Sequence, residues 1–334
     1  MPRFVSEPSC YHKLIFVLGV PEVSIYNNTH KQILKWENNI EVLARLDGKQ
    51  LPITKRLQVP IPGGLAQVVM YLPPDLDTSG KVQYPLLVNV YGGPDSYQST
   101  EKFNIDWSTY LTVNRSIIYV TIDGRGSGLK GNNILFAIYR RLGTYEIEDQ
   151  INVTNYLQQK FPYIDRDRVA IWGWSYGGYA TGMALAHDRK NIFKCGISVA
   201  PVTDWAYYGK LIIFIFLIKI KYLKFNNFFL IIDTIYTERY MGLPRPDDNL
   251  IGYAQAQLND KVENLREKKF FLIHGTLDDN VHYQQSMMLS RALELSDILF
   301  RQQSYPDEEH ALSGVRPHLY HSLEKFLDEC YGLE

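Results

Sequence analysis

The chain has 334 residues, of which 46% are hydrophobic and 21% charged, and its formal net charge is −1. This composition is typical of a soluble globular chain long enough for one large domain and a smaller remainder. The near-zero charge gives no case for binding to nucleic acid or acidic membranes. No zinc or dinucleotide pattern stands out, so we expect neither a metal nor a cofactor.

The N-terminal stretch, residues 11–58, is predicted to form short strands and turns, for example at 20–26 and 41–46. Residues 1–8 contain no apolar segment of the kind that a signal peptide needs. We therefore expect no signal peptide in this chain.

A chemically informative motif, Gly173-Trp-Ser175-Tyr-Gly177, lies between an apolar run at 169–172 and a helix-like stretch at 180–186. Glycines two residues before and after a serine allow the sharp strand-to-helix turn that is the nucleophile elbow of α/β-hydrolases. Such a turn exposes the serine hydroxyl at the carboxyl edge of a sheet. We predict that Ser175 is a nucleophile, with an ordinary structural turn as the alternative.

A nucleophilic serine needs a base and an orienting acid, and the chain supplies both in the order of this hydrolase class. The apolar run at 269–273 is predicted to be a strand and is followed by Asp278 and Asp279, which periodicity cannot separate. A second predicted strand, 299–305, is followed by His310. Functional groups of an open α/β sheet gather beyond strand ends. We therefore choose Asp278 as the acid and His310 as the general base.

Other histidines lie near the same loops. His274 ends the first of these strands and is interpreted as a buried structural residue, while His282 begins a predicted helix and could be solvated. The alternative for His310 is a surface histidine in an acidic loop.

Several short segments of the chain match one family in the same order. The segments are 90–94, 123–128, 140–144, 173–179, 236–242 and 274–282. Together they resemble the dipeptidyl peptidase IV branch of the prolyl oligopeptidase family of serine peptidases. The likeness is dense from about Tyr84 to the C-terminus and looser from about Val20. So many separate matches in one order are highly specific.

The resemblance implies an α/β-hydrolase fold with a doubly wound, mostly parallel sheet. It implies that Ser175, Asp278 and His310 form the catalytic triad, which favours the first of the two adjacent aspartates. Tyr91 matches a tyrosine whose hydroxyl shares the oxyanion hole with the backbone N–H of Tyr176. Two such donors stabilise the transition state of acyl transfer. Without the resemblance, Tyr91 would be interpreted as a packing residue at a strand end.

The resemblance also implies a pocket for the proline ring that precedes the cleaved bond. A flat aromatic box suits a compact pyrrolidine ring and excludes longer side chains. Asn280 and Arg239 match residues that help to position the substrate backbone. The pocket residues are Tyr176, Val202, Trp205, Tyr208, Tyr236 and Val281.

Two of the three cysteines, Cys195 and Cys330, match a pair that is disulfide-bonded in secreted and cell-surface relatives. Cys10 is left over. Sequons at Asn27, Asn114 and Asn152 give weak further support for an extracellular protein, secreted or at the cell surface.

Family members carry a large β-propeller before the hydrolase domain. The resemblance therefore implies that residues 1–58 are the C-terminal remnant of a propeller and that residues 59–334 are the catalytic domain. In the family, the propeller supplies the glutamates that bind the free amino terminus of the substrate and so fix a two-residue register. Relatives also dimerise through both domains, so we expect a homodimer for the full-length parent.

Residues 209–232 depart from the family pattern, because in relatives the counterparts of Tyr208 and Tyr236 lie within a few residues of each other. The unbroken apolar run, 211–218, is shorter than the roughly 20 residues that a transmembrane helix needs. The segment consists mainly of residues with AT-rich codons. It opens with Gly-Lys, which GGTAAG would encode, and this contains a splice-donor-like GTAAG. We favour a retained intron over a membrane-contacting helix.

The sequence thus predicts a serine peptidase that removes N-terminal X-Pro or X-Ala dipeptides from peptides through an acyl-enzyme. One alternative is a broader serine esterase or oligopeptidase, which the aromatic pocket disfavours. Another is a catalytically inactive fragment or a non-enzymatic binding homologue. Inactive relatives have lost the nucleophile, whereas this chain retains Ser175.

Overall fold

The computed structural model describes residues 10–15, 20–208 and 236–333. Residues 209–232, which depart from the family pattern and are called the insert below, lie outside the described residues. Most of the described chain surrounds one large sheet. Its strands are β4 (Ile53–Ile61), β5 (Gly64–Leu72), β6 (Tyr84–Asn89), β7 (Ile118–Asp123), β8 (Ile164–Trp174), β9 (Cys195–Val199), β10 (Lys269–Gly275) and β11 (Arg301–Tyr305).

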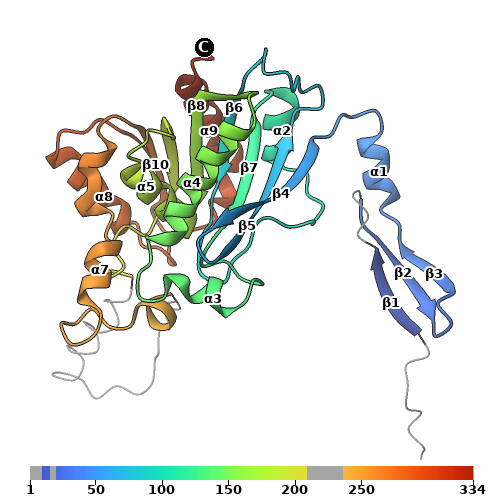
Figure 1. Cartoon of the computed structure of the whole chain (residues 1–334), viewed down its shortest axis with the longest axis horizontal. Coiled ribbons are helices and arrows are strands. Elements are labelled where there is room, and N and C mark those ends of the chain that lie inside the picture. The colour runs from blue at the N-terminus through green and yellow to red at the C-terminus, as the bar shows by residue number, and fades with distance from the viewer. Residues whose placement is uncertain (1–9, 16–19, 209–235, 334) are drawn as a thin grey trace, which may run out of the picture.

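The strands of this sheet lie in the order β11-β10-β9-β8-β6-β7-β5-β4 (Figure 1). All neighbours from β11 to β7 are parallel, and β5 runs antiparallel to both β7 and β4. The predicted mostly parallel sheet is confirmed. The carboxyl ends of its parallel strands therefore meet at one edge.

Helices cover both faces of the sheet, because its strands are apolar on both sides. In β6, Leu86 and Val88 belong to the buried cluster on one face and Leu87 to the cluster on the other. The first face carries α4 (Tyr145–Lys160), α5 (Tyr176–His187), α7 (Leu250–Ala256) and α8 (Gln284–Leu295), and the second carries α2 (Trp107–Asn114) and α9 (Arg316–Tyr331). Shorter helical segments are α3 (Asn132–Leu135), Phe136–Ile138, Thr237–Met241, Asn259–Leu265 and Ser313–Val315.

The elements predicted around the candidate site are confirmed. The apolar runs at 169–172 and 269–273 lie within β8 and β10, the stretch at 180–186 lies within α5, and β11 covers most of 299–305. Each run is bounded by a loop that carries a predicted site residue.

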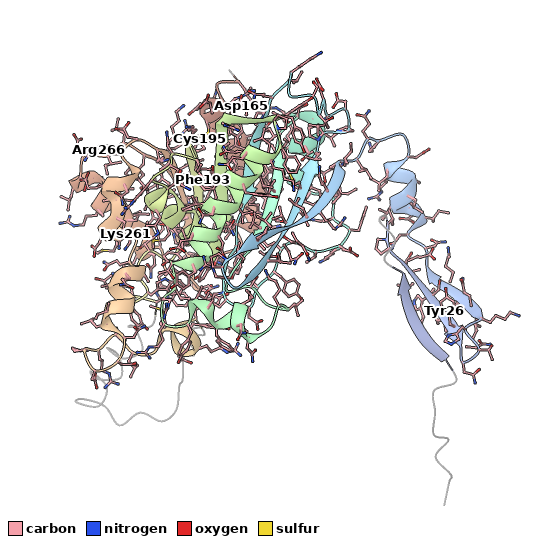
Figure 2. The ribbon with its side chains drawn as sticks, in the orientation of Figure 1. Tyr26, Asp165, Phe193, Cys195, Lys261 and Arg266 are labelled. Atoms are coloured by element: carbon pink, nitrogen blue, oxygen red, sulfur yellow. A yellow bond between two sulfur atoms is a disulfide. The ribbon has the colours of Figure 1, made fainter. Side chains whose placement is uncertain are left out.

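A separate three-stranded antiparallel sheet precedes the large one, in the order β1 (Cys10–Ile15), β2 (Glu22–Asn27), β3 (Gln32–Glu37). It stands apart from the large sheet, with α1 (Ile40–Leu46) beside it (Figure 1). The side chains of β2 and β3, Tyr26 among them, are separate from those that fill the two faces of the large sheet (Figure 2).

The prediction of an extended segment at 41–46 is wrong, because these residues belong to α1. Apolar side chains at Ile40, Leu43 and Leu46 repeat every three residues, which fits one face of a helix. Glu41 in the first turn and Arg45 in the last turn also complement the helix dipole.

The division into domains at residues 58 and 59 stays a prediction. In the structure β4 begins at Ile53 and extends across this position, pairing with β5 along its whole length. Residues 53–58 are therefore part of the large sheet.

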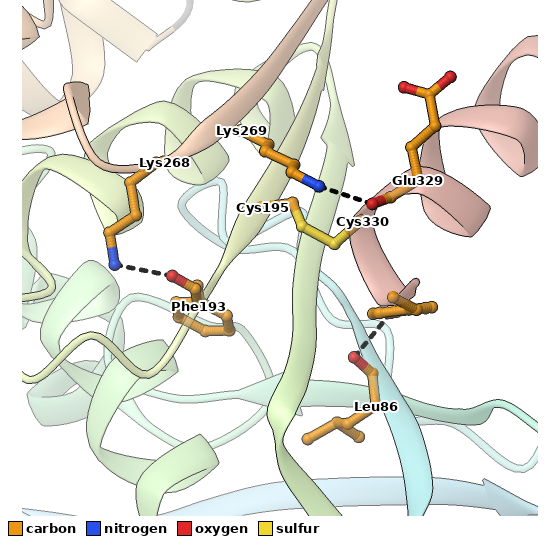
Figure 3. Close-up of a disulfide and its surroundings, with 8 residues drawn as sticks. Leu86, Phe193, Cys195, Lys268, Lys269, Glu329 and Cys330 are labelled. Atoms are coloured by element: carbon orange, nitrogen blue, oxygen red, sulfur yellow. Dashed lines mark hydrogen bonds between the residues drawn. A yellow bond between two sulfur atoms is a disulfide. The ribbon is translucent and has the colours of Figure 1, made fainter. Parts of the chain in front are cut away.

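The predicted disulfide joins Cys195, at the start of β9, to Cys330, near the end of α9 (Figure 3). Nearby, the Lys269 ammonium donates to the carbonyl of Glu329 at 2.6 Å, and the Tyr331 hydroxyl donates to the carbonyl of Leu86 at 2.9 Å. These three links attach the last helix to the centre of the sheet.

Replacing both Cys195 and Cys330 with serine is expected to lower the free energy of unfolding by about 2–5 kcal/mol. The disulfide closes a loop of 135 residues, and longer loops lose more entropy when they are closed in the unfolded chain. Denaturant unfolding of the oxidised chain and the variant measures the difference. A reductant should shift the wild type toward the variant and leave the variant unchanged. Equal unfolding midpoints for both would contradict the prediction.

Candidate active site

The predicted catalytic residues follow four strands of the large sheet that run in the same direction. Tyr91 follows β6, Ser175 follows β8, Asp278 follows β10 and His310 follows β11. Parallel strands bring their carboxyl ends to one edge, where the loops of an open α/β sheet form its site. Residues that are far apart in the sequence therefore share this edge.

Ser175 occupies the sharp turn between β8 and α5, with φ 61° and ψ −121°. Its N–H donates to the carbonyl of Val199 at 2.8 Å. A Cβ added to Gly177 would lie 2.1 Å from the carbonyl oxygen of Val90, and one added to Gly173 would lie 2.3 Å from the oxygen of Gly177. The predicted elbow is present, and both glycines are needed because backbone fills the space around the serine.

Asp278 is the aspartate that contacts His310, with 2.6 Å between Oδ2 and the Nδ1 of the histidine. Its side chain is fully buried, whereas Asp279 is exposed. The other carboxylate oxygen accepts hydrogen bonds from the N–H groups of Asn280 at 3.0 Å and Val281 at 2.8 Å. With its Nδ1 engaged, His310 has Nε2 as the ring nitrogen that can accept a proton.

A second histidine shares the carboxylate of Asp278, which sequence reasoning missed. The Nε2 of His274 lies 3.0 Å from Asp278 Oδ2 and 2.8 Å from the carbonyl oxygen of Val281, and its Nδ1 lies 2.6 Å from the hydroxyl of Ser286. Both neighbours of Nε2 are acceptors, so this nitrogen carries the hydrogen. His274 is buried, as predicted, but it also fixes the acid.

The two histidines determine how Asp278 titrates. Burial acts to raise the pKa of Asp278, but the hydrogen bonds from His274 and His310 outweigh it and bring the pKa down to about 2. The carboxylate is therefore ionised at neutral pH, as an acid that orients and stabilises an imidazolium must be.

Contacts between loops hold His310 near the nucleophile. The indole N–H of Trp174, the residue before Ser175, donates to the carbonyl of His310 at 2.9 Å. The backbone N–H of Leu277 donates to the carbonyl of Glu308 at 3.1 Å. The loop after β11 is thus bonded both to the loop after β10 and to the end of β8.

Tyr91 lies beside the elbow. Its N–H donates to the side-chain oxygen of Gln98 at 2.8 Å, and the N–H of Gln98 donates in turn to the carboxylate of Asp123 at 2.9 Å. Its hydroxyl lies 2.9 Å from the hydroxyl of Tyr236. Sequence reasoning did not find Gln98, because nothing local to it indicates a contact with Tyr91.

The backbone N–H of Tyr176 belongs to the first turn of α5, whose N–H groups have no partner within the helix. It therefore stands where a helix N-terminus can donate to an anion. The rings of Tyr91 and Tyr176 lie next to each other, with centroids 6.1 Å apart.

The residues predicted to bind proline lie together. The ring centroid of Trp205 lies 5.4 Å from that of Tyr176, 5.5 Å from that of Tyr208 and 6.1 Å from that of Tyr236. The Tyr208 hydroxyl donates to the side-chain oxygen of Asn280 at 3.2 Å. Val202 and Val281 are buried in the same hydrophobic cluster.

Arg239 is not brought into this group. It is exposed, and its guanidinium carbon lies 6.0 Å from the ring centroid of Tyr240. In the described part of the chain, no cluster of histidine, cysteine or carboxylate side chains is placed to hold a metal ion, and a triad needs none.

Comparison with known proteins identifies the family of this chain. The model of the prolyl oligopeptidase family matches residues 103–217 and 221–334. The chain belongs to the prolyl oligopeptidase family. The match is interrupted at 218–220, inside the insert.

Individual relatives agree with this assignment. Venom dipeptidyl peptidase 4 of Vespa velutina is 49% identical over 93% of this chain, and dipeptidyl peptidase 4 of Bos taurus is 41% identical over 94%. The crystal structure of Porphyromonas gingivalis dipeptidyl peptidase 4 superposes with a TM-score of 0.82 at 30% identity and covers 96% of the chain. The predicted α/β-hydrolase fold is thus confirmed.

The relatives are much longer than this chain. The matched region spans 37% of the wasp protein, 38% of the bovine protein and 42% of the bacterial chain.

The low pKa of Asp278 predicts how stability depends on pH. A carboxyl whose pKa is lower in the folded chain than in the unfolded chain, about 3.9, stabilises the fold above pH 4 and loses this contribution as the pH falls toward 2. The difference in free energy of unfolding between the wild type and Asp278→Asn is expected to shrink by about 2 kcal/mol between pH 6 and pH 2.

Urea unfolding at several pH values measures this difference. Asp279→Asn serves as the control, because it removes the adjacent carboxylate, which is exposed. A pH-independent difference for Asp278→Asn would show that the carboxylate is not stabilised by its histidines.

Proposed function

We propose that this chain is the catalytic part of a serine peptidase that removes N-terminal X-Pro or X-Ala dipeptides from peptides. The observation that carries the proposal is the hydrogen-bonded pair of Asp278 and His310 at the sheet edge where the strained elbow presents Ser175. The relatives named as dipeptidyl peptidases support it.

In the proposed reaction, Nε2 of His310 takes the proton of Ser175 as the serine oxygen attacks the substrate carbonyl carbon. The carboxylate of Asp278 stabilises the resulting imidazolium through Nδ1. The hydroxyl of Tyr91 and the N–H of Tyr176 stabilise the negative oxygen of the tetrahedral intermediate. The imidazolium then protonates the leaving amine, and water, deprotonated by His310, hydrolyses the acyl-enzyme.

The aromatic cluster next to the elbow supports a preference for a small residue before the cleaved bond. The rings of Tyr176, Trp205, Tyr208 and Tyr236 form close aromatic contacts and are proposed to be the walls of the proline pocket. Rigid aromatic walls fit a flat pyrrolidine ring and exclude long side chains. Asn280, bonded to Tyr208, is proposed to contact the substrate backbone.

The two-residue register, homodimerisation and an extracellular location belong to the longer protein and are proposed from the family resemblance. The disulfide between Cys195 and Cys330 supports an oxidising compartment. The longest described helices, α4 and α9, have 16 residues each, and none in the described part of the chain would span a bilayer, which takes about 20 apolar residues.

A fluorophosphonate probe tests the nucleophile, because it needs an activated serine and an oxyanion hole but no bound peptide terminus. We expect Ser175 to be labelled both in the full chain and after deletion of residues 209–232. Ser175→Ala should abolish labelling. Asp278→Asn should slow it about a thousandfold or more, since the imidazole loses its orienting partner. Asp279→Asn is the matched control and should react at the wild-type rate.

Labelling only after the deletion would mark residues 209–232 as foreign to the fold and support the retained intron. No labelling of either form would contradict the proposed function. Comparing hydrolysis of an X-Pro amide with that of a simple ester then separates a proline-specific peptidase from a broader esterase, since only the former depends on the aromatic pocket.

A further inference from the structure

Glu146 is a buried carboxyl group that the proposed mechanism does not use. It lies in the first turn of α4 and is 2% exposed. Its Oε1 accepts hydrogen bonds from the N–H of Gly143 and, at 2.9 Å, from the hydroxyl of Tyr176. Its Oε2 accepts from the N–H of Thr144 at 3.2 Å. Three donors from two separate parts of the chain thus converge on one carboxyl.

Tyr176 connects this carboxyl to the candidate site. Its backbone follows Ser175 directly, and its ring lies 5.4 Å, centroid to centroid, from both Trp205 and Tyr236. The elbow fixes one end of the residue and Glu146 binds the other. A group outside the aromatic cluster therefore restrains the hydroxyl end of this ring.

The turn just before Glu146, at Gly143, packs closely against α5. Gly143 has φ 81°, and a Cβ there would lie 2.0 Å from the hydroxyl of Tyr179 and 2.8 Å from the terminal methyl of Met183. Only glycine allows this approach. The close packing of the Gly143 backbone on these two side chains thus holds the start of α4, and Glu146 with it, against α5.

Glu146 is not balanced by a positive charge, since none of the ion pairs found in the described residues includes it. Burial raises the pKa of Glu146 to about 7, although the N–H of Gly143 and the hydroxyl of Tyr176 act to lower it. A buried carboxyl is costly unless its hydrogen bonds are made. Capping α4 accounts for the bonds from Gly143 and Thr144 but not for the bond from Tyr176.

We propose that Glu146 is a positioning residue for the substrate pocket, holding the Tyr176 ring in the orientation that admits a five-membered proline ring and excludes larger ones. This inference rests on the proposed function, because it assigns the selectivity of the same site.

The test measures how well two cyclic amides protect Ser175 from fluorophosphonate labelling. One is an aminoacyl pyrrolidide, with a five-membered ring, and the other is the corresponding six-membered piperidide. The readout is the half-protecting concentration of the piperidide divided by that of the pyrrolidide. Loss of a cap or of general stability would not change this ratio in a particular direction.

We expect Glu146→Leu, which leaves no acceptor for the Tyr176 hydroxyl, and Tyr176→Phe each to lower the ratio about fivefold. Because the two residues act through one hydrogen bond, the double variant should lower it no further. Glu148→Gln is the matched control. It removes a carboxylate from the same helix turn, but its side chain is 52% exposed and pairs with Arg125, so the ratio should stay at the wild-type value.

Tyr176→Phe keeps the hydrogen bonds of Glu146 to Gly143 and Thr144, so it tests the inference even if Glu146→Leu does not fold. An unchanged ratio in Tyr176→Phe would overturn the inference and leave the proposed function intact. Effects that multiply in the double variant would also overturn it, because Glu146 would then act by another route. A wild-type chain that is not labelled at all would instead overturn the proposed function, and the inference with it.

Discussion

The carbonyl oxygen of Val90 touches the turn that carries Ser175, and the geometry of the whole site depends on this contact. A Cβ would lie 2.1 Å from that oxygen at Gly177 and 2.5 Å at Gly173. Val90 directly precedes Tyr91, so the same close approach that allows the elbow also brings a candidate oxyanion donor beside the nucleophile. The absence of side chains at these two glycines thus allows β6, β8 and α5 to approach one another closely.

The pKa values of two buried carboxyl groups near this point are shifted in opposite directions. Burial acts to raise the pKa of both, yet that of Asp278 falls to about 2 and that of Glu146 rises to about 7. The difference lies in their partners, since Asp278 has two histidines and Glu146 has only neutral donors. The first arrangement keeps a carboxylate charged beside a base, and the second keeps a hydrogen-bond acceptor behind a pocket wall.

The sequence alone predicted the elbow, the strands around it and the order of the candidate triad, because these features depend on local motifs and strand ends. It could not predict that Glu146 accepts from Tyr176, since 30 residues separate them and only the packing of α4 on α5 joins them. His274 was predicted to be buried, but its bond to Asp278 depends on how the loop after β10 folds back. The extended segment predicted at 41–46 was wrong because helical spacing outweighed the short apolar pattern.

The most direct test of the account is a crystal structure of the chain with a fluorophosphonate bonded to Ser175. The account predicts that the phosphoryl oxygen lies within hydrogen-bonding distance of both the Tyr91 hydroxyl and the Tyr176 N–H. It also predicts that His310 lies between the serine oxygen and Asp278. A phosphoryl oxygen directed away from these two donors, or His310 bonded to a group other than Asp278, would contradict it.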